Sequence, residues 1–174
     1  PSGMEPGFSE TSAFTPPAVT FPNGCQVCEV EIDEETGAVR IVRHTVVDDV
    51  GTMVNPMLVE GQIHGGVVQG LGQGLFEELT YEPATGQLLA GSFMDYAMPR
   101  ADDVPFFDVD SHGVPTKVNL LGAKGVGEAG TVGALPALVN AVNDALAPLG
   151  VRHLDMPVTP ERVWRAIREA TGAG

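Results

Sequence analysis

Residues 61–76 read GQIHGGVVQGLGQGLF, and the composition of this stretch decides how the chain folds. It follows Asn55-Pro56, which favours a helix start because Asn caps helix N-termini and Pro suits the first helical position. The stretch holds six glycines, and each costs roughly 1 kcal/mol in a helix relative to Ala. It holds no Asp, Glu, Lys or Arg, the residues that normally cover an exposed helix face. We therefore predict a long helix to about residue 79 whose surface is covered.

The predicted helix has two unlike faces when its residues are placed on a helical wheel. Gln62, Gln69 and Gln73 fall on one line, which Gly65 and Gly66 flank. The opposite side carries apolar residues, namely Val67, Val68, Leu71, Leu75 and Leu79. Neutral amides donate and accept hydrogen bonds, so the first face suits a polar neutral or anionic partner. Tight packing within the protein itself explains the same glycines equally well.

Strand and helix patterns surround this helix. Residues 24–32 and 38–47 alternate apolar and polar side chains about a turn at 34–37, which predicts a β-hairpin. Helices are expected after Gly130, ending at Gly150, and again from Thr159-Pro160. The remaining expectations are strands at 87–96 and 117–121, and loops at 48–55, 97–116 and 122–130. The predicted fold class is α+β, with a β-hairpin and short strands packed with three main helices.

Composition excludes several classes of function. The net charge of −14 comes from 23 acidic against 9 basic residues, so a polyanion such as DNA would be repelled. No apolar run approaches the roughly 20 residues that a membrane span needs, and no basic region followed by an apolar stretch marks a signal peptide. The opening PSGMEPGFSETSAFTPP resembles a loop, so we expect a fragment, a cleaved chain or a naturally split subunit.

The cysteines and histidines do not form a recognisable metal motif. Cys25 and Cys28 lie in a predicted strand, where residues three apart point to opposite faces and cannot share a metal. No second CxxC completes a four-thiolate site, and this cysteine usage is compatible with a reducing compartment. The four histidines share no ligand spacing and are expected to be structural or to lie at the surface; they are His44, His64, His112 and His153.

The stretch 125–130, GVGEAG, places one acid inside a glycine-rich loop before a predicted helix. It matches the G-x-G-x-x-G pattern of dinucleotide-binding proteins, but Glu128 would put a negative charge where the pyrophosphate approaches. A carboxylate at a helix N-terminus is stabilised by free amides and the helix dipole, and it can act as a general base. A merely favourable acid in the first helical turn explains the residue as well.

Several longer stretches, in fixed order, resemble the C-terminal region of the large subunits of molybdenum hydroxylases. This family comprises enzymes of the xanthine dehydrogenase, aldehyde oxidase and carbon monoxide dehydrogenase kind. The similarity is greatest to the carbon monoxide dehydrogenase branch. The matching stretches are VVDDVGTMVNPMLVEGQIHGGVVQGLGQGLFEE (46–78), GSFMDYAMPRADDVP (91–105), LLGAKGVGEAGTVGALPALVNAVNDAL (120–146) and RHLDMPVTPERVWRAI (152–167).

The resemblance implies a molybdopterin cofactor that carries molybdenum, in the cytosine dinucleotide form usual in bacteria. It implies that Glu128, in the GxGE motif, is the catalytic base that takes a proton from a metal-bound hydroxyl, so that water-derived oxygen attacks an electron-poor carbon. It also implies that Gln62 contacts the cofactor region and that the backbone of 124–127 lies nearby. The corresponding cofactor-binding residues are Gln62, Lys124, Gly125, Val126 and Gly127.

The same resemblance implies that the chain works within a larger complex. The expected partners are the remainder of the molybdenum subunit, an iron–sulfur subunit and a flavin (FAD) subunit, with a small-molecule substrate and a cytoplasmic location. We expect an irregular segment at 1–22 and a molybdopterin-binding portion at 23–174. Carbon monoxide, an aldehyde, a purine and an N-heteroaromatic compound all remain possible substrates. The alternative is a non-catalytic module or remnant that stabilises a partner.

Overall fold

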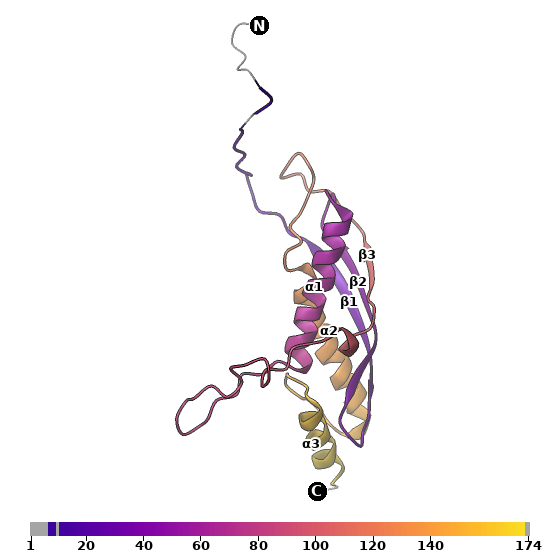
Figure 1. Cartoon of the computed structure of the whole chain (residues 1–174). Helices are drawn as coiled ribbons and strands as arrows, with labels where there is room; N and C mark the ends of the chain where they lie inside the picture. The colour runs from indigo at the N-terminus through magenta and orange to yellow at the C-terminus, as the bar shows by residue number, and fades with distance from the viewer. Residues whose placement is uncertain (1–6, 10, 173–174) are drawn as a thin grey trace.

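The computed structural model describes residues 7–9 and 11–172. A three-stranded sheet lies on one side of the molecule and two long helices cover it, as Figure 1 shows. Helix α2 contacts both the sheet and helix α1, and α3 lies at one end. The elements are β1 (Asn23–Ile32), β2 (Val39–Asp49), α1 (Pro56–Leu75), η1 (Ala101–Asp103), β3 (Asp108–Ser111), α2 (Ala129–Leu146), η2 (Ala147–Leu149) and α3 (Pro160–Thr171). The α+β prediction with three main helices is confirmed.

The predicted hairpin is confirmed as antiparallel β1 and β2, which pair from Asn23 opposite Asp49 to Ile32 opposite Val39. The turn closes where the amide of Gly37 donates to the carbonyl of Asp33 at 2.7 Å. Gly37 has φ of +73°, and a Cβ there would lie 2.1 Å from the carbonyl oxygen of Pro160. Only glycine permits both this backbone conformation and this approach of α3.

Glycines in α1 make the close contact with α2. A Cβ on Gly66 would lie 3.0 Å from the backbone nitrogen of Thr131, and one on Gly70 would lie 3.0 Å from the Cβ of Ala134. On the other helix, a Cβ on Gly130 would lie 2.4 Å from the carbonyl oxygen of Ile63. The glycine-rich composition therefore serves helix packing, one of the two interpretations left open by the sequence.

The prediction that Gly65 and Gly66 both flank the line of glutamines on α1 is only partly correct. Gly66 is buried against α2, because α2 packs on the side of α1 that carries Gly66 together with Ile63 and Gly70. No atom lies within 4 Å of the position where a Cβ would stand on Gly65, so this residue does lie on an open face. Gln62, Gln69 and Gln73 are exposed. The open face of α1 consequently consists of amides with Gly61 and Gly65.

Two predicted strands do not form. Residues 87–96 form only an isolated bridge between Leu88 and Tyr81, and a local turn at Ser92, whose hydroxyl donates to Asp95 at 2.6 Å, ends any extended run. This segment belongs to an arm that projects away from the layers (Figure 1). Residues 117–121 form turns, because the side chain of Asn119 bonds both the amide and the carbonyl of Ala123.

Strand β3 lies inside the region 97–116 that was expected to be a loop. It pairs in parallel with the end of β2, from Thr45 opposite Asp108 to Asp48 opposite Ser111. Val109 is partly buried between the exposed Asp108 and Asp110, and this alternation indicates a strand. The many prolines and aspartates around the strand make the pattern hard to recognise in the sequence. Strand β2 also continues to Asp49, two residues beyond the expected end of the hairpin.

The helix boundaries follow local capping. The side chain of Asn55 accepts from the amide of Leu58 at 3.2 Å, which confirms the predicted start of α1. The helix ends at Leu75 rather than near residue 79, because the amides of Phe76 and Glu77 both turn back to the carbonyl of Gly72. Helix α2 contains Pro136 and continues through it.

The core lies between the helices and the sheet and is built from small and medium aliphatic side chains. Helix α2 contributes Ala134, Leu138, Val142 and Leu146, all fully buried. By length and composition alone, Ala129–Leu149 could cross a membrane, contrary to the expectation that no apolar run is long enough. This helix packs against both α1 and β1, and its buried residues form one stripe along it, namely Gly130, Ala134, Leu138, Val142 and Leu146.

The segment predicted to be irregular at 1–22 is described in part, since residues 1–6 and 10 lie outside the described residues. Residues 11–22 form neither helix nor strand and extend from the layers along one end of the molecule (Figure 1). The division of the chain between residues 22 and 23 stays a prediction.

The packing of α1 on α2 predicts opposite effects of two Gly-to-Ala changes. Gly130→Ala should destabilise the protein by about 1–3 kcal/mol, because its Cβ meets the backbone of α1 and the helices must separate. Gly61→Ala should raise stability by up to about 1 kcal/mol, since its position is open and Ala favours helix. Chemical unfolding of the purified variants measures both, and equal effects would contradict the close-contact interpretation.

Candidate functional site

The loop before α2 is attached to the chain that follows β2. The amide of Lys124 donates to the carbonyl of Val50 at 2.9 Å, and the amide of Thr52 donates to the carbonyl of Gly122 at 3.0 Å. These bonds belong to an antiparallel bridge between Gly51 and Ala123. The start of the GVGE stretch therefore has a fixed position relative to the sheet.

An ion pair reinforces this attachment. The Nζ atom of Lys124 lies 2.5 Å from Oδ2 of Asp49, and both side chains are largely buried, with 11% and 15% of their surface exposed. Oδ1 of Asp49 accepts from the amides of Val114 at 2.8 Å and Gly51 at 2.9 Å. The Lys124 hydrogen bond and these amides hold the pKa of Asp49 well below its usual range. The Lys124 side chain is thus engaged within the protein, and its backbone borders the loop.

Helix α1 holds the other end of the loop. The Nε2 atom of the exposed Gln62 donates to the carbonyl of Gly127 at 2.8 Å. The structure thereby brings Gln62 next to the other selected residues, 124–128, which follow it in the chain by more than 60 positions. Val126 turns inward and packs against the core, which anchors the centre of the loop.

The glycines of the loop leave its outer surface bare. No atom lies within 4 Å of the position where a Cβ would stand on Gly125 or on Gly127. A ligand can therefore approach the backbone closely at both residues. The open glycines of the loop and the amide of Gln62 together form a neutral polar surface without a bulky side chain.

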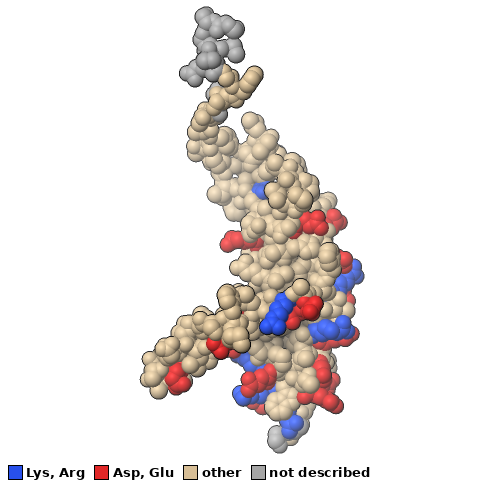
Figure 2. Space-filling model, in the orientation of Figure 1, with Lys and Arg blue, Asp and Glu red and all other residues tan. Residues whose placement is uncertain are grey.

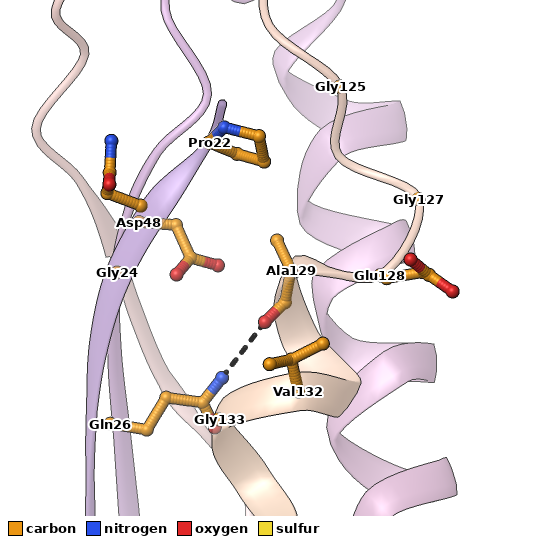
Figure 3. Close-up of a pocket in the computed structure, with 11 residues that line it drawn as sticks. Pro22, Gly24, Gln26, Asp48, Gly125, Gly127, Glu128, Ala129, Val132 and Gly133 are labelled. Atoms are coloured by element: carbon orange, nitrogen blue, oxygen red, sulfur yellow. Dashed lines mark hydrogen bonds between the residues drawn. The ribbon is translucent and has the colours of Figure 1, made fainter. Parts of the chain in front are cut away.

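Glu128 stands at the N-cap position of α2 with φ of −117° and ψ of 0°. Its side chain is exposed and makes no capping hydrogen bond. Figure 3 shows its carboxylate pointing away from Asp48 and Pro22, which lie across the neighbouring cavity. Throughout the described part of the chain, no hydrogen bond or ion pair engages this carboxylate, so it is available to an external group.

Two hollows flank the loop. One, of about 450 Å³, lies between the start of β1 and the start of α2 and is shown in Figure 3; its lining includes Gly24, Gln26, Asp48 and Gly127. The other, of about 520 Å³, lies on the α1 side and is lined by Thr52, Leu58, Gln62 and Lys124, among others. Glu128 and Gly127 consequently stand on a ridge that is accessible from outside.

Three polar residues near the loop were missed by sequence reasoning. Asp48 is only 2% exposed, one of its carboxylate oxygens has no partner among the described residues, and burial raises its pKa. Gln26 donates to the carbonyls of Ala129 and Gly130, and His44 is bonded to Gln26. The signal for Gln26 is its position on a strand face whose other inward residues are apolar, and the signal for His44 is its place next to the apolar Val46 on the inward face of β2.

The cysteine prediction agrees with the structure. Cys25 is exposed and Cys28 is half-buried on the same strand, and both are free thiols. Burial, with the nearby Glu29, raises the pKa of Cys28 to about 11, so this thiol is unreactive. Among residues 7–9 and 11–172, no group of three His, Cys, Asp or Glu side chains could hold a metal ion. The dinucleotide alternative for 125–130 also lacks its context, because the described chain has no strand directly before the loop.

Comparison with known proteins assigns the family. A model of the molybdopterin cofactor-binding domain matches residues 3–105, more than half of the chain. The chain belongs to this family. The resemblance to molybdenum hydroxylase large subunits, inferred from the sequence motifs, is thereby confirmed.

Individual relatives extend the match beyond the GVGE loop. The carbon monoxide dehydrogenase large chain of Hydrogenophaga pseudoflava is 41% identical over 169 residues, which cover 97% of this chain and 21% of that protein. The nicotine 6-hydroxylase large subunit of Paenarthrobacter nicotinovorans is 45% identical over 168 residues, covering 97% and 20%. The chain therefore spans about a fifth of the length of the curated relatives it matches.

Solved structures agree with this assignment. Reconstituted CO dehydrogenase from Oligotropha carboxidovorans superposes with a TM-score of 0.91 at 38% identity, over 99% of this chain and 21% of that chain. Quinoline 2-oxidoreductase from Pseudomonas putida 86 superposes with a TM-score of 0.77 at 46% identity, over 80% and 18%. The molybdopterin-binding family and the α+β fold are common to enzymes with quite different names.

The ion pair at the loop predicts a pH-dependent loss of stability in Lys124→Met. Because the pKa of Asp49 is depressed in the folded protein, its charge contributes fully to stability above the ordinary carboxyl pKa. This contribution begins to decline as the pH falls below about 4 and is lost as the pH falls further, through the depressed folded-state pKa. The variant should therefore be less stable than the parent at pH 7, and the difference should shrink towards pH 3. Chemical unfolding at several pH values measures this.

Arg165→Met is the control for this experiment, since it removes an exposed pair with Glu161 within α3. It should cost only about 0.3–0.5 kcal/mol at pH 7. A Lys124→Met effect as small as this, or one that is constant down to pH 3, would show that the Lys124–Asp49 pair does not hold the loop.

Proposed function

We propose that this chain supplies the catalytic base and part of the cofactor surface of a molybdopterin-dependent hydroxylase or dehydrogenase. The observation that carries the proposal is the position of Glu128: an exposed carboxylate without a partner in the described chain, in an open glycine loop next to Gln62. Members of the family named in the comparisons include carbon monoxide dehydrogenase and nicotine 6-hydroxylase.

The residues around the loop fit a large polar cofactor. The space that a Cβ would occupy on Gly125 and Gly127 is free, so a ring system with oxygen atoms can lie against the backbone. We assign contact with the cofactor to Gln62 and to the backbone of 124–127. Such a cofactor, in its cytosine dinucleotide form with molybdenum, supplies the centre that accepts two electrons from the substrate.

Glu128 acts as general base in this proposal. Its carboxylate accepts a proton from a water-derived nucleophile, which then attacks an electron-poor carbon of a small molecule. The carboxylate stands at the N-terminus of α2 and makes no hydrogen bond with the amides there, so both of its oxygens are open to a proton. The three residues directly before Glu128, Gly125, Val126 and Gly127, carry no titratable side chain.

The proposal also concerns the assembly in which the chain works. The remainder of the molybdenum subunit completes the cofactor surface, and electrons pass to iron–sulfur and FAD groups on partner subunits. We place this assembly in the cytoplasm and treat residues 23–174 as the cofactor-binding portion. The alternative function, a non-catalytic module that stabilises a partner, is favoured only if the chain associates without molybdenum.

The base assignment predicts a large loss of activity in Glu128→Gln. The amide keeps the shape of the side chain but cannot accept the proton, so turnover should fall by at least about 100-fold. The molybdenum content should be unchanged, because the side chain does not hold the loop. Steady-state kinetics and metal analysis of the assembled enzyme measure both quantities.

Glu78→Gln is the matched control, since Glu78 is an exposed acid just beyond α1. It should leave turnover and molybdenum content unchanged. Near-normal turnover in Glu128→Gln, with the control intact, would refute the assignment of Glu128 as the base.

Purification of the chain from its source, with mass spectrometry of its partners and molybdenum counted per polypeptide, tests the assembly. We expect a second large-subunit polypeptide or region, iron–sulfur and flavin subunits, and close to one molybdenum per chain. Recovery of the chain with a partner but without molybdenum would support the non-catalytic alternative instead, and recovery of the chain alone would contradict the proposed assembly.

A further inference from the structure

A second glutamine holds the start of α2 from the side of the sheet. Gln26 lies on β1, and its Nε2 donates to the carbonyl of Gly130 at 2.9 Å and to that of Ala129 at 3.3 Å. Figure 3 shows this side chain reaching across from the strand to the first turn of the helix. These carbonyls belong to the two residues that follow Glu128.

His44 determines which way the Gln26 amide faces. Its Nε2 lies 2.9 Å from Oε1 of Gln26, and the imidazole is fully buried. Burial lowers the pKa of His44 to about 4, so the ring is neutral near pH 7 and carries one N–H. Nδ1 of His44 has no partner among the described residues, so the proton on Nε2 is the one that makes a bond. His44 therefore donates to Oε1, which leaves the NH₂ of Gln26 directed at α2.

Helix α2 leaves room for this side chain. A Cβ on Gly133 would lie 2.7 Å from Cδ and Nε2 of Gln26 and 2.8 Å from its Cγ. The Gln26 amide thus lies directly on the glycine backbone, about one helical turn after Glu128. A side chain at position 133 would displace Gln26 from the two carbonyls.

The two glutamines bracket Glu128. Gln62 of α1 holds the carbonyl of Gly127, which precedes it, and Gln26 of β1 holds the carbonyls that follow it. The carboxylate itself makes no bond within the described chain, so the described residues position Glu128 through its backbone. Both tethers act on the main chain and leave the carboxylate free.

We propose that Gln26, oriented by His44, is a positioning residue for Glu128 that holds the first turn of α2 so that the carboxylate meets its substrate. The inference rests on the proposed role of Glu128 as base. A displacement of about 1 Å between reacting groups can cost about 100-fold in rate. Loss of the Gln26 tether should therefore reduce turnover without removing any group that reacts.

Gln26→Glu in the assembled enzyme is the sharpest test, because it keeps the size of the side chain and an acceptor for His44. It removes only the N–H groups directed at the carbonyls of α2 and places a carboxylate there. We expect kcat to fall about 10- to 100-fold, with KM and molybdenum content near the parent values. Amide hydrogen exchange, followed by mass spectrometry, should become faster in peptides that cover 125–134.

Further variants separate positioning from folding. Gln87→Met, on the projecting arm, changes a glutamine whose side chain contacts only a neighbouring carbonyl, and it should leave every quantity unchanged. His44→Phe keeps a ring at the buried position but removes the donor, and a smaller fall in kcat in the same direction is expected. If Gln26→Glu fails to assemble, His44→Phe and Gln26→Met provide the same comparison.

The double variant Gln26→Glu/Glu128→Gln identifies the route by which Gln26 acts. If Gln26 works through Glu128, the double variant should turn over no more slowly than Glu128→Gln alone. An additional loss, or a normal kcat in Gln26→Glu while Glu128→Gln is impaired, would overturn the positioning role but not the base. Normal turnover in Glu128→Gln would instead refute the proposed function, and the positioning role with it.

Discussion

The close contact between α1 and α2 is the constraint on which the rest of the structure depends. It is possible only because Gly66 and Gly70 face the first turns of α2 and Gly130 faces the backbone of α1. The hydroxyl of Thr131 adds a bond to the carbonyl of Gly66 at 3.0 Å across the same contact. Glycines weaken a helix, so α1 depends on its buried side chains and its neighbour rather than on intrinsic propensity. Because the contact is at the N-terminal end of α2, it also determines where the preceding loop lies.

The position of the loop then follows from bonds to three different elements. Gln62 of α1 reaches Gly127, Gln26 of β1 reaches the first turn of α2, and Asp49 at the end of β2 holds Lys124. None of these bonds uses the carboxylate of Glu128 or the space beside Gly125. The face of the molecule in Figure 2 is consistent with this separation, since charged side chains are few at the end from which the N-terminal segment leaves and gather towards α3. The charged or titratable side chains described at the site are thus Glu128, the buried Asp48 and the Lys124–Asp49 ion pair.

Sequence reasoning predicted those features that local chemistry determines. The hairpin follows from the alternation about its turn, the start of α1 from Asn55-Pro56, and α3 from Thr159-Pro160. It failed where distant contacts decide: β3 exists because it lies beside the end of β2, whereas residues 87–96 have the composition of a strand but only a single bridge to Tyr81. At the candidate site, the motifs selected Glu128 and Gln62 as candidates but did not select Gln26. Nothing local to a strand shows that its inward amide meets a helix more than 100 residues later. The inward position of Gln26 and His44 among apolar neighbours was the available signal.

Glu128 occupies the N-cap of α2 without capping the helix, and the main chain on either side of it is held by hydrogen bonds from Gln62 and Gln26. An acid at this position normally accepts a hydrogen bond from an amide of the first turn, which stabilises the helix but occupies the carboxylate. In this protein the side chain makes no such bond, and α2 therefore lacks that contribution at its N-terminus. Gln26, Gln62 and Thr131 hold the same turn through its carbonyls and a hydroxyl instead. The start of the helix is thereby fixed by neutral groups, which leaves the carboxylate of Glu128 free for the proton transfer that we propose.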